Sequence, residues 1–216
     1  MPITTVVFDV GETLVDETRH WSDWADWMNV PTFTFFAAMG VIVERRRPHQ
    51  EVFELVQPGY DLKEAQAKRK AAGWTYSLER GDFYTDAFPC VADLRSRGYR
   101  VGISGNQPEA AETSLREVGI AADFIASSTS WGVEKPSPAF FERVVREAGC
   151  PAAEIAYVGD RLDNDVLPAK AAGMTAIFIR RGPWGIVHAG WPEAAQADAQ
   201  LESLSELRSA IERIET

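Results

Sequence analysis

Residues that could do chemistry on an anionic electrophile stand at four separate places, three at predicted strand ends and one in the loop before a predicted helix. They are Asp9, Ser104, Lys135, Asp160 and Asp165. A carboxylate at a strand end can act as a nucleophile, while a hydroxyl and an ammonium group can bind developing negative charge. We therefore take Asp9, Ser104 and Lys135 as the candidate catalytic residues.

Small and polar residues follow two of these positions and could bind an anion. They are Val10, Gly11, Glu12 and Thr13 after Asp9, and Gly105 and Asn106 after Ser104. Backbone N–H groups in such turns form concave sites for phosphate-like anions. We expect these six residues to bind a phosphate group.

The three aspartates predict a divalent cation. Asp160 and Asp165 are five residues apart, about 140° on a continuous helix, so they converge only if the chain turns after Gly159. Without a cation, at least one carboxylate in a group with Asp9 would have to take up a proton. Oxygen ligands, with no Cys/His cluster, favour Mg²⁺ over Zn²⁺. We expect Asp9, Gly11, Asp160 and Asp165 as the metal ligands.

The elements that must position these residues alternate between strand and helix. Predicted strands cover residues 3–9, 99–104, 123–126, 154–158, 174–179 and 199–201, with a Gly/Pro/Trp-rich loop expected after residue 179. Apolar strands separated by helices imply right-handed crossovers and a mainly parallel sheet covered on both faces. Ligands bind beyond the carboxyl ends of such strands, which predicts one rim for the site.

A helical block interrupts this α/β pattern after the first strand. We assign residues 1–15 and 87–216 to the α/β core and residues 16–86 to an inserted, all-helical cap. Trp21, Trp24 and Trp27 recur at intervals of three on a predicted helix. Their spacing indicates a packed helix face, with a pocket lining as the alternative.

Composition and charge indicate which classes of binding partner and which cellular compartment to expect. The chain has 216 residues and a formal net charge of −10, which disfavours nucleic acid and anionic membranes as partners. The longest apolar stretch, residues 33–43, is too short for a membrane helix. An N-terminus without signal-peptide features and only two cysteines predict a cytoplasmic protein. The sequence leaves the oligomeric state open.

The order of these residues resembles the four motifs of the haloacid dehalogenase-like (HAD) hydrolases. Asp9 and Thr13 match the DxDxT motif, Ser104 the second motif, and Lys135 with Pro136 the third. The segment GDRLDND matches the fourth motif, GDxxxxD. The resemblance spans about residues 3 to 180 and implies a Rossmann-like core with a helical cap.

The resemblance also implies an activity. Most such proteins with this acid set are Mg²⁺-dependent phosphatases, so we expect hydrolysis of small phosphorylated metabolites through an aspartyl-phosphate on Asp9. Positioning and charge neutralisation by Ser104 and Lys135 suit that reaction.

One position departs from the family pattern. Gly11 stands where HAD phosphatases carry an aspartate that protonates the leaving group. Glu12, Asp16 and Glu17 are the nearby candidates for a replacement acid, and the residues do not choose among them. Two alternatives therefore stay open: a catalytically silent protein that binds phosphate and Mg²⁺, or a hydrolase of the dehalogenase or phosphonatase type.

Overall fold

A computed structural model describes residues 2–216 and divides them into two compact units. One unit contains residues up to Asp16 together with Leu78–Thr216, and the other contains Glu17–Ser77. The first is an α/β unit and the second is helical. The helical unit ends at Ser77, nine residues before residue 86, where the sequence predicted the end of the cap. The reason is that Phe83 is buried in the α/β core and Asp86 pairs with Arg181 there.

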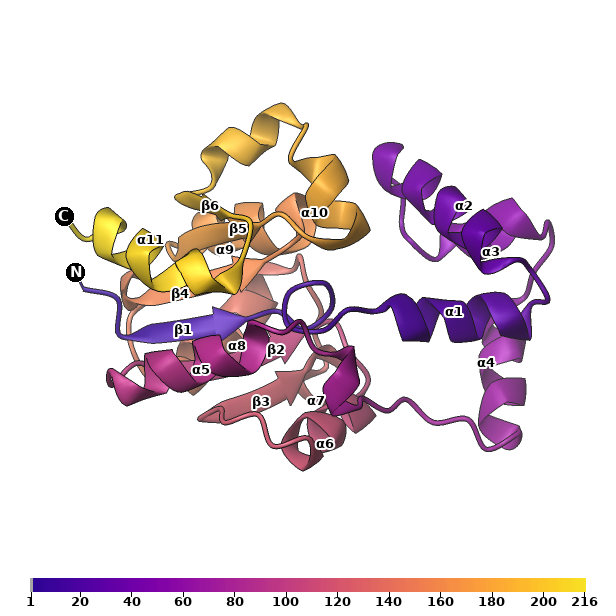
Figure 1. The fold of residues 1–216 in the computed structure, drawn as a ribbon, viewed down its shortest axis with the longest axis horizontal. Helices are drawn as coiled ribbons and strands as arrows, with labels where there is room; N and C mark the ends of the chain where they lie inside the picture. Colours follow the sequence, from indigo (N-terminus) through magenta and orange to yellow (C-terminus); the bar gives the residue numbers. More distant parts are fainter. Residues whose placement is uncertain (1) are drawn as a thin grey trace. The chain divides into compact units, whose positions relative to one another are not determined.

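The α/β unit is built on a six-stranded parallel sheet in the order β3-β2-β1-β4-β5-β6 (Figure 1). The strands are β1 (Thr5–Phe8), β2 (Arg100–Gly105), β3 (Phe124–Ser127), β4 (Ile155–Gly159), β5 (Thr175–Ile179) and β6 (Ala199–Leu201). Each adjacent pair is parallel. This confirms the predicted Rossmann-like α/β class. The chain order reverses beside β1, where ligand sites form in such sheets.

Alternating side chains of the strands form two cores, one on each face of the sheet. Val6 and Phe8 of β1 belong to one core, and Val7 belongs to the other. Because both faces are covered, the strands are apolar without a polar face. Because the strands are parallel, their carboxyl ends lie at a single rim of the sheet.

Helices cover both faces of this sheet (Figure 1). Helices α5 (Ala87–Ser96) and α11 (Leu207–Ile214) contribute to the first core, and α8 (Pro138–Ala148) and α9 (Leu167–Ala171) to the second. Helix α8 begins with Pro138 and ends at Gly149, whose φ of +69° closes the helix in the left-handed region. The remaining helices are α6 (Glu109–Glu117), α7 (Ser128–Trp131) and α10 (Gly182–His188), with short turns η1 (Arg80–Asp82), η2 (Ala152–Glu154), η4 (Pro192–Gln196) and η5 (Leu204–Glu206), and the π-helical turn η3 (Leu162–Val166).

The prediction of a loop after β5 is wrong, because helix α10 forms there. Its first turn contains Pro183, which is favourable at the start of a helix because it lacks an N–H that would have no partner there. Trp184 and His188 are buried on one side of it. Glycine and proline had favoured a loop in the sequence, but burial of these two side chains stabilises a helix.

The helical unit contains α1 (Thr18–Trp27), α2 (Thr32–Glu44), α3 (Glu51–Val56) and α4 (Leu62–Ala71). Trp24 is buried and lies edge-on to Phe53, whereas Trp27 is 42% exposed. The predicted packed face is therefore confirmed for Trp24 but not for Trp27. The guanidinium of Arg69 lies against the rings of both Trp24 and Trp74, at 4.0 and 3.9 Å from their centroids.

No single helix among the described residues is both long and apolar enough to cross a bilayer. Helices α1 and α2 pass that length and composition test only as a pair, and the pair is bent by 113°.

Candidate active site

Asp9 lies at the carboxyl end of the central strand. It follows β1 directly, and its amide donates to the carbonyl of Val158 in β4 at 2.9 Å. On the other side, Phe8 pairs with Ile103, which places Ser104 next to Asp9 across the sheet. A strand with a neighbour on each side holds its last residues rigidly, so this aspartate is well positioned for chemistry.

Lys135 is buried against two of the aspartates. Its Nζ lies 2.5 Å from Oδ1 of Asp9 and 2.6 Å from Oδ1 of Asp165. Burial acts to lower the pKa of Lys135, but the carboxylates of Asp165 and Asp9 outweigh it and raise that pKa well above its usual value. The side chain is therefore a fixed positive charge at the site.

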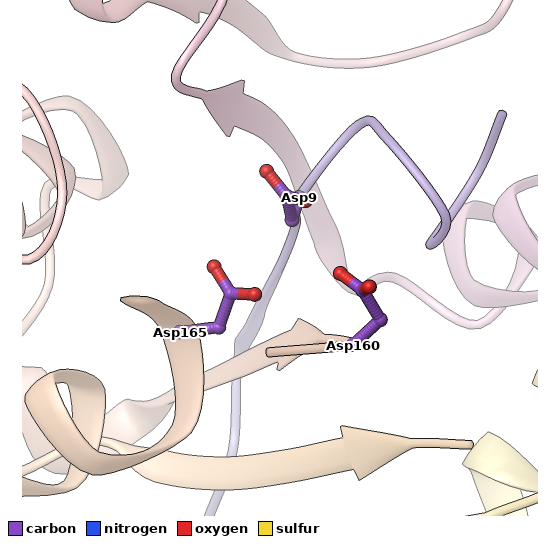
Figure 2. Close-up of side chains that lie close together, drawn as sticks. All are labelled: Asp9, Asp160 and Asp165. Carbon is purple, nitrogen blue, oxygen red and sulfur yellow. The ribbon is translucent and has the colours of Figure 1, made fainter. Parts of the chain in front are cut away.

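Three carboxylates converge at this rim, as Figure 2 shows. One oxygen from each of Asp9, Asp160 and Asp165 lies within 4.8 Å of the others, and all three residues are buried. Burial, together with the neighbouring carboxylates, raises the pKa of Asp160 well above its usual value. Burial also raises the pKa of Asp165 to about 6, although Lys135 opposes it. The cluster carries more negative charge than Lys135 can neutralise.

Several buried polar atoms at the site have no hydrogen-bond partner among the described residues. They are Oγ of Ser104, Oγ1 of Thr13 and Oδ2 of Asp160. Buried polar groups without partners are rare, and at this site they are free to bind an ion or a ligand. An oxygen-only cluster of acids with an unpartnered carboxylate oxygen fits Mg²⁺, and the two hydroxyl groups fit an anion.

The turn after Asp9 has an unusual backbone. Glu12 has a φ of +52°, in the left-handed region that favours glycine, and its side chain is buried. Its carboxylate accepts a hydrogen bond from the hydroxyl of Tyr84 at 2.6 Å, and its amide donates to the carbonyl of Val15 at 2.6 Å. That amide is already used within the turn. The amide of Glu12 is therefore not among the donors that we propose for phosphate.

Asn106 holds the loop that carries the lysine. Its side-chain amide donates to the carbonyl of Lys135 at 2.9 Å, and its Oδ1 accepts from the amide of Lys135 at 2.7 Å. Asn106 thus orients the backbone at Lys135 with both ends of its side chain. Because both polar atoms of the Asn106 side chain bind Lys135, only the backbone N–H of Asn106 remains an expected donor to an anion.

Three residues that sequence reasoning missed support the site. Arg181 donates to the carbonyl of Thr13 at 3.1 Å and forms a two-pronged ion pair with Asp86. Tyr84 contacts Glu12, as described above, and Tyr157 donates to the carbonyl of Ser104 at 3.0 Å. Arg181 comes just after β5, so the rule that sites gather at strand ends could have found it. Neither tyrosine has a comparable signal.

The chain belongs to the haloacid dehalogenase-like hydrolase family, because the sequence model of that family matches residues 3–173. That match covers well over half of the chain and includes Asp9, Ser104, Lys135, Asp160 and Asp165. The family expected from the four motifs is therefore confirmed.

Similar proteins include several phosphatases. A glyceraldehyde 3-phosphate phosphatase of Methanopyrus kandleri is 39% identical over 47% of this chain and 45% of its own length. The first relatives therefore match over only about half of their length. A glyceraldehyde 3-phosphate phosphatase of Pyrococcus furiosus is 30% identical over 98% of this chain and 94% of its own length.

A solved structure shares the fold over nearly the whole chain. The crystal structure of a predicted phosphoglycolate phosphatase of Haemophilus somnus covers 96% of this chain and 97% of its own, with a TM-score of 0.73. The two sequences are 17% identical, so this likeness concerns the fold alone.

Proposed function

We propose that this chain is a Mg²⁺-dependent phosphatase of small phosphorylated metabolites. The observation that carries the proposal is the meeting of Asp9, Lys135, Asp160 and Asp165 at one rim, beside the unpartnered hydroxyl of Ser104. Phosphoryl transfer depends mainly on positioning and charge neutralisation, and this cluster supplies both. The two relatives described above are phosphatases of a small phosphorylated metabolite, which supports the substrate class.

Asp9 is the nucleophile in this proposal. Its carboxylate attacks phosphorus, the bond from phosphorus to the leaving oxygen breaks, and an aspartyl-phosphate forms. Water then hydrolyses the aspartyl-phosphate, which releases inorganic phosphate and restores Asp9. Lys135 holds the carboxylate of Asp9 in place for the attack, because its ammonium group lies against that carboxylate.

The phosphate oxygens find donors on both sides of Asp9. The hydroxyl groups of Ser104 and Thr13 are buried and have no partner among the described residues. We add the backbone amides of Val10, Gly11, Gly105 and Asn106 as further donors. Such donors need no rearrangement as charge develops on the phosphoryl group.

Asp9, Asp160 and Asp165, with Gly11 through its backbone, would hold the Mg²⁺ ion. When bound, the ion supplies positive charge that neutralises the carboxylates and the phosphoryl oxygens. The unpartnered oxygen of Asp160 and the raised pKa of its carboxyl group support this assignment.

The inserted helical unit, residues 17–77, follows the nucleophile turn directly in the chain. We propose that it acts as the cap and selects the substrate. The net charge of −10 supports a small molecule as partner in place of nucleic acid or membrane. The free thiols of Cys90 and Cys150 support a cytoplasmic location.

The test is a phosphate-release screen over phosphorylated metabolites, with and without Mg²⁺. We expect Mg²⁺-dependent release by the natural chain and a loss of about 10³-fold or more in Asp9→Asn. Asp26→Asn is the matched control, because Asp26 is exposed in the helical unit. Turnover by Asp9→Asn at the natural rate would contradict the proposal.

A second candidate is favoured by Gly11, which cannot donate a proton to a leaving group. In that case the chain binds Mg²⁺ and phosphate without turning over. The same screen separates the two, because the silent protein would bind inorganic phosphate and release none from any ester.

A further inference from the structure

The acidic segment turns through η3, and the first amide of that turn is deeply buried. Leu162 is fully buried, and its N–H donates to Nδ1 of His188 at 3.0 Å. His188 is the last residue of α10 and is 1% exposed. A buried N–H without an acceptor costs about 1 to 3 kcal/mol. The turn therefore depends on an acceptor that lies 26 residues away in the chain.

The hydrogen bonds next to this amide stay within the turn. The amide of Arg161 donates to Oδ2 of Asp165 at 3.0 Å, and the carbonyl of Arg161 accepts from the amide of Asp165 at 3.0 Å. The guanidinium of Arg161 binds the carboxylate of Asp163. The bond from Leu162 to His188 differs, because it ties the turn to a separate helix.

One contact of the imidazole and one close approach of its helix hold His188 in place. Its ring stacks on Trp191, with centroids 3.8 Å apart and planes inclined by 28°. One turn earlier in α10, a Cβ added to Gly185 would lie 2.8 Å from the carbonyl oxygen of Ile179. Glycine thus lets α10 lie against the end of β5. A ring fixed in this way presents Nδ1 to Leu162 in one orientation.

We propose that His188 is a positioning residue for the metal site. As the neutral tautomer with its proton on Nε2, it accepts from Leu162 and holds Asp160 and Asp165 where they bind the cation. This inference rests on the proposed function, in which these two aspartates are Mg²⁺ ligands. Groups outside the ligand set orient the ligands, and their loss typically weakens metal binding 10- to 100-fold.

A pair of variants whose side chains have the same branching and the same number of heavy atoms tests the acceptor. His188→Asn keeps an oxygen acceptor at the place of Nδ1, whereas His188→Leu puts a methyl group there. Both variants lose the ring contact with Trp191, so any effect of packing is shared. We expect the Mg²⁺ dissociation constant, measured by calorimetry on the full chain, to rise about tenfold or more in His188→Leu. In His188→Asn it should stay within about threefold of the natural value.

Two results would overturn the role of His188. One is a His188→Leu variant that binds Mg²⁺ as tightly as the natural chain. The other is a His188→Asn variant as weak as His188→Leu, because a merely structural ring would show no rescue by an acceptor. A natural chain that binds no Mg²⁺ would instead contradict the proposed function, and the role of His188 with it.

A measurement on the natural chain keeps the inference testable if the variants fail to fold. Nitrogen-15 spectra of the histidine rings at neutral pH report which ring nitrogen carries the proton. We expect Nδ1 of His188 to be unprotonated. A proton on Nδ1 would make that atom a donor, and it could then not accept from Leu162.

Discussion

A Cβ atom added to Gly105 would lie 2.5 Å from Oδ1 of Asp9. Gly105 ends β2, the strand beside β1, so the absence of a side chain there leaves room for the carboxylate at the next strand. The same relationship recurs on the other side of β1. A Cβ added to Gly159 would overlap the side chain of Asp165. Glycines at the ends of the two strands that flank β1 thus make space for two of the clustered acids.

Gly105→Ala should therefore displace the nucleophile. Because a shift of about 1 Å at a reacting group can cost 10²-fold, we expect phosphate release to fall by about that factor. The measurement is the turnover number beside the midpoint of thermal unfolding. Gly81→Ala is the matched control, since a Cβ there meets nothing within 4 Å. A Gly105→Ala variant with natural kinetics would contradict the expected displacement of Asp9.

The missing acid at Gly11 predicts a dependence on the leaving group. Without a proton donor, aryl and acyl phosphates should react much faster than alkyl phosphates, because their leaving groups are stable as anions. Gly11→Asp should raise the rate on alkyl phosphates by about 10²-fold and change aryl rates little. Rates are compared across a series of leaving groups. A flat series for the natural chain would show that another residue supplies the proton.

Mg²⁺ should stabilise the chain more at neutral than at acid pH. The pKa of Asp165 is raised to about 6 and that of Asp160 well above its usual value, so the folded, metal-free chain binds protons that the unfolded chain has released. Stability from Asp165 is present below about pH 4 and is lost as the pH rises through about 6, and Asp160 acts in the same direction. Mg²⁺ needs the ionised carboxylates, so its effect grows over the same range.

Thermal unfolding with Mg²⁺ or with a chelator measures this effect. At about 100 times the dissociation constant, Mg²⁺ contributes about 2.7 kcal/mol, a rise of several degrees, near neutral pH. The rise should shrink at about pH 5 and disappear in Asp160→Asn. An equal rise at both pH values would mean that the cation binds elsewhere.

The helical unit should lose stability in acid through His20. Burial, and then the charges of Arg69 and Arg19, lower the pKa of His20 to about 4 from 6.5. His20 therefore binds a proton below pH 6.5 in the unfolded chain but only below about pH 4 in the folded chain. The contribution of neutral His20 to the free energy of unfolding is complete above pH 6.5. It is lost as the pH falls towards 4, by at most about 3 kcal/mol.

Urea unfolding of the full chain across this pH range, followed by tryptophan fluorescence, checks the contribution of His20. His20→Gln cannot titrate, so the difference in unfolding free energy between it and the natural chain should shrink as the pH falls. A difference that stays constant with pH would show that His20 titrates normally in the folded chain.

Local pattern in the sequence was enough to predict the sheet and most of the site. Apolar runs predicted all six strands within about two residues at each end, because parallel strands buried on both faces are apolar throughout. Once the strands are parallel, their carboxyl ends must share a rim. That is why Asp9, Ser104 and Asp160 could be brought together from their positions alone.

Tertiary structure decided the contacts that no spacing encodes. Lys135 reaches Asp9 across 126 residues, and Leu162 finds its acceptor in His188. The left-handed backbone of Glu12 turns its carboxylate towards Tyr84, although a glutamate in a turn carries no sign of that conformation. Such contacts depend on the paths of loops and on which side chains are buried together, and periodicity in the sequence reports neither.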